Sequence, residues 1–116
     1  TLAPNALALE VVAAGIRAAG SVPVTLVNEP ILISAGKNSD VRYNYFYPRW
    51  AYDQYRQQMA QAAQSNGWTY LDMWDAAPES DFTNSAIHLT PAATASLARN
   101  IGAALACRQK GPALAV

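Results

Sequence analysis

One loop of the sequence reads Asp81-Phe82-Thr83-Asn84-Ser85-Ala86-Ile87-His88-Leu89-Thr90-Pro91, and it holds the only histidine of the chain. It lies between residues 68–73, which we expect to form a strand, and a helix that begins at Thr90-Pro91, since Thr is a good N-cap and Pro suits the first helical position. Loops at the carboxyl ends of strands carry the chemistry in open α/β sheets. Because histidine exchanges protons readily near neutral pH, His88 is a candidate general base. A surface or capping role is the alternative.

Further segments extend this pattern toward the N-terminus. Residues 4–19 have apolar residues at helical spacing, with Pro4 or Asn5 at the start and Gly20 at the end. Residues 22–28 and 68–73 are predicted strands, and residues 49–66 between them form an amphipathic helix. This order predicts a parallel pair with a helical crossover. The nearly continuous apolar run of the first strand predicts burial on both faces.

The third predicted helix presents a core face of Leu97, Ile101, Ala104 and Leu105. A Gly-Pro step follows, so we expect residues 108–116 to be a frayed tail and residues 1–107 to form the folded part. Two strands and three helices leave apolar sheet edges uncovered, which natural proteins avoid. We therefore expect another polypeptide segment to complete the sheet.

The first strand ends in polar residues. Asn28 and Glu29 follow its apolar run, so they are candidate substrate-binding residues at the sheet edge, although Asn28 alternatively caps a turn. The connection over residues 31–48 is long and rich in aromatic residues, and Tyr45 is a third candidate for substrate binding. A lid packed on its own domain is the alternative for this connection.

Composition excludes several classes of function. Lys and Arg number 8, as do Asp and Glu, so no charged surface indicates nucleic acid or an anionic membrane. No apolar run approaches the roughly 20 residues of a membrane span. The acids Asp72, Asp75, Glu79 and Asp81 precede the single His, but they match no zinc or calcium pattern. We therefore expect neither a metal nor another cofactor.

The block Phe-Thr-Asn-x-x-x-His-Leu-Thr-Pro resembles the last motif of the SGNH (GDSL-type) hydrolases, and the resemblance spans roughly residues 21–105. It implies that His88 is the catalytic base and that the chain is part of a three-layer α/β/α, flavodoxin-like parallel sheet. The family carries its acid three residues before the His, where this chain has Ser85. Asn84 or Asp81 is then expected to orient the imidazole.

The family's Gly-Asp-Ser and Gly-x-Asn-Asp blocks do not occur in this sequence. The resemblance therefore implies the C-terminal half of such a domain, either a processed piece or a fragment, with the nucleophilic Ser and the oxyanion hole on an N-terminal half. The substrate would be an ester or an acylated carbohydrate. A polysaccharide O-acetyltransferase, or a non-catalytic carbohydrate-binding or assembly module of the same shape, is the alternative.

Overall fold

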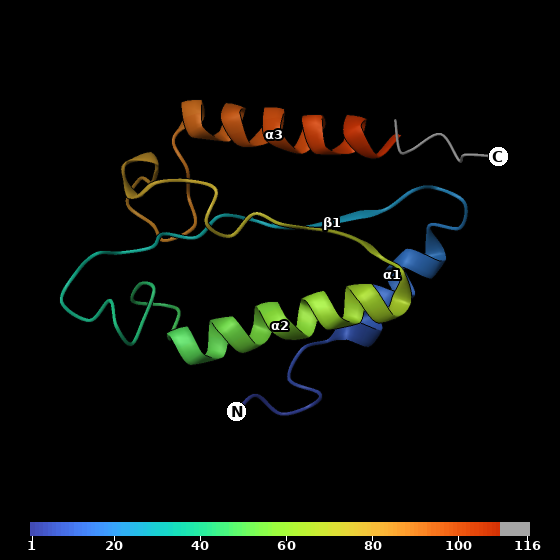
Figure 1. The fold of residues 1–116 in the computed structure, drawn as a ribbon, viewed down its shortest axis with the longest axis horizontal. Helices are drawn as coiled ribbons and strands as arrows, with labels where there is room; N and C mark the ends of the chain where they lie inside the picture. Colours follow the sequence, from blue (N-terminus) through green and yellow to red (C-terminus); the bar gives the residue numbers. More distant parts are fainter. Residues whose placement is uncertain (110–116) are drawn as a thin grey trace.

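The computed structural model describes residues 1–109 and shows a mixed α/β arrangement with a two-stranded sheet. The elements are α1 (Leu9–Ala18), β1 (Thr25–Asn28), α2 (Arg49–Asn66), β2 (Thr69–Asp72), a 3₁₀ turn η1 (Glu79–Asp81) and α3 (Pro91–Gln109). In Figure 1 the strands run between α3, in orange, and α2, in green. No helix among the described residues combines the length and apolarity that a membrane crossing requires.

The two strands are parallel, as predicted from the strand–helix–strand pattern. Their register pairs Thr25 with Thr69 and Asn28 with Asp72, so both strands end at the same edge. Met73 N–H donates to the Asn28 carbonyl at 3.0 Å and extends the pairing one step further. The loops that follow β1 and β2 therefore leave the sheet side by side.

Both strands are shorter than predicted. β1 begins at Thr25 rather than residue 22, because Pro23 has no N–H for a ladder and the turn after α1 extends through residues 19–22. The expectation of burial on both faces is wrong for the described residues, since only Asn28 of β1 is buried. The reason is that β1 has a strand neighbour on one side only.

Helix α1 begins at Leu9, so the predicted start at Pro4 or Asn5 is wrong. Residues 4–7 form turns instead, and Ala8 occupies the N-cap without a side-chain hydrogen bond. The Leu2 amide donates to Gln54 Oε1 at 2.6 Å. This contact holds the N-terminal segment against α2, so tertiary packing overrides the local capping signal.

Helices α2 and α3 begin where the sequence predicts. α2 ends at Gly67, whose φ of 67° is the left-handed conformation that glycine adopts without strain. Thr90 Oγ1 accepts from the Ala93 amide at 3.2 Å and caps α3. α3 continues to Gln109, and the rest of the predicted frayed tail, residues 110–116, lies outside the described residues.

The core is aromatic and lies between the sheet and α2. Ile31, Tyr43 and Tyr52 are buried together, and Tyr47 and Trp74 pack against them. The ring centroids of Tyr43 and Trp74 lie 5.0 Å apart in an edge-to-face arrangement. The long connection over residues 31–48 therefore supplies core side chains, which agrees with the alternative of a segment packed on its own domain.

Candidate functional site

The loop that carries His88 is closed on itself. Phe82 and Leu89 form an isolated antiparallel bridge, and the Thr83 amide donates to the His88 carbonyl at 2.9 Å. The Thr90 amide donates to the Asp81 carbonyl at 2.8 Å. These bonds hold the two ends of the loop together and place His88 directly before α3.

His88 is exposed and lines a hollow of about 400 Å³ at the carboxyl edge of the sheet. The hollow takes residues from three segments, the end of β1, the histidine loop and the first turns of α3: Glu29, Pro30, Ile87, His88, Leu89, Thr94 and Leu97. An imidazole in this position is accessible to a solute from outside. The geometry therefore suits proton transfer to a group that enters the hollow.

The two orienters expected from the sequence do not contact the imidazole. Asn84 is exposed, and its Oδ1 accepts from Thr83 Oγ1 at 3.4 Å. Asp81 is partly buried at the start of the loop and does not line the hollow of His88. Ser85 Oγ, at the position where an acid was expected, accepts from the Ile87 amide at 3.3 Å. Within residues 1–109 no hydrogen bond or ion pair engages the ring of His88.

Asn28 is buried, and its side chain is fully engaged by its own protein. Nδ2 donates to Asp72 Oδ1 at 2.9 Å and lies 3.2 Å from the Tyr52 hydroxyl. Oδ1 accepts from Tyr55 Oη at 3.2 Å and lies 3.4 Å from Tyr52 Oη. An asparagine side chain offers two donors and two lone pairs, so no capacity remains for a substrate. The structure indicates that Asn28 joins β1 to α2 and β2.

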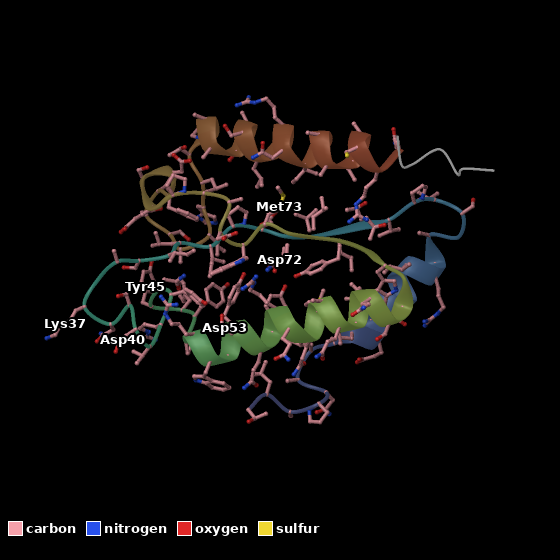
Figure 2. All side chains as sticks on the ribbon, viewed as in Figure 1. Lys37, Asp40, Tyr45, Asp53, Asp72 and Met73 are labelled. Atoms are coloured by element: carbon pink, nitrogen blue, oxygen red, sulfur yellow. The ribbon has the colours of Figure 1, made fainter. Side chains whose placement is uncertain are left out.

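Asp72 extends this network to a cation. Its Oδ2 accepts from Arg56 Nε at 2.9 Å and lies 2.8 Å from Nη2 of the same guanidinium. Arg56 stacks over the Trp74 ring, 4.1 Å from its centroid. In Figure 2 Asp72 lies on the α2 side of the strand, whereas Met73 is on the side of α3.

Burial changes the ionisation of the tyrosines in this network. Burial raises the pKa of Tyr52 to about 12, with the nearby Tyr55 and Asp72 adding to the shift. Burial also raises the pKa of Tyr55, and the charge of Asp72 raises it further. Both hydroxyls therefore stay protonated at neutral pH, so they act as donors within the core and not as bases.

A larger hollow of about 660 Å³ adjoins the first, because Glu29, Pro30 and Ile87 line both. Its walls are mostly apolar and include Val27, Tyr52 and residues of the N-terminal segment. The hollow lies beside β1, whose second edge carries no strand among the described residues.

The aromatic connection divides into buried and exposed parts. Tyr43 is buried, and its hydroxyl donates to Asp53 Oδ1 at 2.6 Å. Tyr45 is 60% exposed, and its ring stacks on Phe46 with centroids 4.5 Å apart. Figure 2 shows Tyr45 near the start of α2, at the same end of the molecule as Lys37 and Asp40. The structure therefore places Tyr45 at the surface, away from the residues that line the His88 hollow.

No group of three metal-ligating side chains gathers anywhere in residues 1–109. Tyr52, Tyr55 and Arg56 were not predicted from the sequence to be partners of the sheet edge, although they bond Asn28 and Asp72. The sequence did contain a signal for these contacts. The three residues carry polar groups at helical spacing, and Asn28 and Asp72 are polar residues at the ends of the two strands.

The chain matches no family model, no curated protein and no solved structure.

Proposed function

We propose that this chain is the C-terminal part of an SGNH-like acyl hydrolase and that His88 is its general base. The observation that carries the proposal is the position of His88, exposed in an open hollow between the end of β1 and the start of α3. The motif Phe-Thr-Asn-x-x-x-His-Leu-Thr-Pro supports the assignment. The substrate class is an ester, including an acylated carbohydrate.

The proposed active protein has a three-layer α/β/α, flavodoxin-like sheet that an N-terminal half completes. Two features support this arrangement. Among residues 1–109, β1 has a strand partner on one edge only, and an apolar hollow lies beside β1. Large apolar side chains such as Val11, Val22 and Ile87 are 64%, 65% and 47% exposed. A neighbouring strand and its helices would cover such surface and remove the free edge.

The proposed reaction is acyl transfer in two steps. A Ser on the N-terminal half attacks the ester carbonyl while its hydroxyl proton passes to the imidazole of His88. The tetrahedral intermediate collapses, and His88 returns the proton to the departing alcohol. Water then attacks the acyl-serine, His88 takes the proton of the water, and the serine recovers it as the carboxylic acid leaves. In an O-acetyltransferase a sugar hydroxyl takes the place of this water.

The test replaces His88 by Ala in the complete protein and measures turnover of p-nitrophenyl acetate. Loss of a general base is expected to lower kcat by roughly 10²-fold or more. The melting temperature should stay unchanged, because His88 is exposed and its backbone bonds do not need the ring. The exposed Asn100→Ala on α3 is the matched control. Unchanged turnover in His88→Ala would contradict the proposal.

A second candidate function is a non-catalytic carbohydrate-binding or assembly module. The observation that favours it is the exposure of three aromatic side chains in sequence proximity: Tyr45, Phe46 and Trp50 are 60%, 59% and 54% exposed. Aromatic faces stack on sugars and also anchor protein interfaces. Labelling with a fluorophosphonate distinguishes the two functions. A hydrolase reacts at its serine, whereas a binding module does not react and loses glycan affinity in Tyr45→Ala but not in His88→Ala.

A further inference from the structure

Asn28 and Glu29 are consecutive residues at the end of β1, and their side chains are engaged differently. Asn28 faces α2, because its side chain bonds the hydroxyls of Tyr52 and Tyr55. Glu29 is next in the chain and precedes Pro30, which holds the preceding residue in an extended conformation. Glu29 lies just past the last paired residue of β1, and it lines both hollows at this edge, the larger one with Tyr52 and Tyr55 and the smaller one with His88. In Figure 1 α3 lies across the strands from α2.

The smaller hollow lies between the end of β1, the histidine loop and α3. Glu29 lines it together with His88, and Thr94 and Leu97 of α3 form the far wall. Glu29 is the one acidic residue among the side chains that line this hollow. A carboxylate and an imidazole from two different loops therefore share one space at the carboxyl edge of the sheet.

The carboxylate of Glu29 is available for such a partner. No hydrogen bond or ion pair within residues 1–109 engages it, and the residue is exposed. Asp72 is occupied by Arg56 and Asn28, and Asp53 accepts from Tyr43, whereas Asp81 does not line the hollow. Glu29 is thus an unengaged acid at the site, with a side chain long enough to move within the hollow.

We infer that Glu29, and neither Asp81 nor Asn84, is the positioning residue that orients His88. The inference rests on the proposed function. In the assembled protein the carboxylate accepts a hydrogen bond from one ring N–H of His88, which leaves the other nitrogen free to take the serine proton. It also stabilises the imidazolium that forms as that proton arrives. The acid of the dyad thus comes from the end of β1 instead of the histidine loop.

The test compares five variants of the complete protein with p-nitrophenyl acetate as substrate. Glu29→Gln keeps the shape and removes the charge, so kcat should fall by roughly 10⁴-fold, the loss seen when a triad acid becomes an amide. KM should change little, because the acid does not bind the ester. Asp81→Asn, Asn84→Ala and the control Glu79→Gln should each retain kcat within about two-fold of the wild type. Added formate should restore part of the activity of Glu29→Ala, a rescue that a structural role would not show.

A proton NMR spectrum gives a readout that does not depend on turnover. A carboxylate bond should slow the exchange of the imidazole N–H, giving a downfield resonance that is absent from His88→Ala. Loss of this resonance in Glu29→Gln supports the inference, and its persistence there overturns it. If His88→Ala loses activity while Glu29→Gln retains it, the inference fails and the proposed function stands. If His88→Ala retains activity, the proposed function and the inference both fail.

Discussion

Replacement of Asn28 by Ala should destabilise the protein strongly, although Asn28 is a polar residue near a candidate site. Its side chain is buried, and it donates to Asp72 at 2.9 Å and accepts from Tyr55 at 3.2 Å. The hydroxyl of Tyr52 lies 3.2 Å from Nδ2 and is itself buried. Truncation therefore removes the partners of two hydroxyls and one carboxylate at once.

The magnitude follows from the burial of each partner. Tyr52 keeps no replacement in the described network, so its orphaned hydroxyl costs about 1–3 kcal/mol. Tyr55 is half-buried and recovers part of its loss from water, which adds about 1 kcal/mol. Asp72 retains Arg56 and adds little. The free energy of unfolding should therefore fall by about 2–4 kcal/mol.

Urea unfolding of the complete protein, followed by tryptophan fluorescence, measures this change. Asn66→Ala is the matched control, since Asn66 is exposed and bonds only the Ala62 carbonyl of its own helix. Its effect should stay within about 0.5 kcal/mol. Tyr52→Phe combined with Asn28→Ala should cost less than the sum of the single changes, because the hydroxyl left without a partner is then absent. Additive effects, or equal effects of Asn28→Ala and Asn66→Ala, would refute the network.

Three further predictions concern the fold. Burial raises the pKa of Tyr52 from 10.0 to about 12, so the contribution of Tyr52 to stability is complete below pH 10 and is lost as the pH rises toward 12. The midpoint of urea unfolding should fall over this pH range, and Tyr52→Phe should make the fall smaller. Gly67→Ala should destabilise the protein by about 1 kcal/mol because Gly67 has a positive φ. Gly102→Ala within α3 should stabilise it by up to about 1 kcal/mol. Neither added Cβ meets an atom within 4 Å, so equal shifts of the melting temperature would contradict this prediction. Residues 1–116 expressed alone should show no cooperative thermal transition with a native-like near-UV spectrum, because large apolar side chains are exposed and one edge of β1 has no strand partner among residues 1–109.

Helix positions and strand direction were predictable because local signals determine them. Helix α2 runs over the predicted residues, with Pro48 before its first turn and Gly67 at its end. The parallel pairing of β1 and β2 followed from the helical crossover and is confirmed by the register. The start of α1 was not predictable from its capping residues, because residues 4–7 form turns and the segment before α1 contacts Gln54, which is far away in the sequence.

The polar network was not predictable from the sequence, because its members are also far apart along the chain. Asn28 and Arg56 belong to different elements, and only the packing of α2 against the sheet brings both to Asp72. The sequence left two roles open for Asn28, substrate binding or a local cap. The observed role is a third, since its side chain links three elements. Periodicity identifies which face of α2 is apolar, but it does not identify which polar side chains meet across that face.

The two residues at the end of β1 differ in their contacts, because Asn28 is buried and hydrogen-bonded whereas Glu29 is exposed. Asn28 points to the α2 face, where every polar atom of its side chain has a partner within the protein. Asn28 therefore stabilises the fold, and its side chain has no free donor or acceptor for a substrate. Glu29 follows directly after it, exposed and lining the His88 hollow. A single-residue shift in the register of β1 would place Glu29 opposite Asp72, so that two carboxylates would be neighbours and the bond from Asn28 to Asp72 would be lost. The hydrogen bond between Asn28 and Asp72 therefore favours the observed register, which leaves Glu29 beside the His88 hollow.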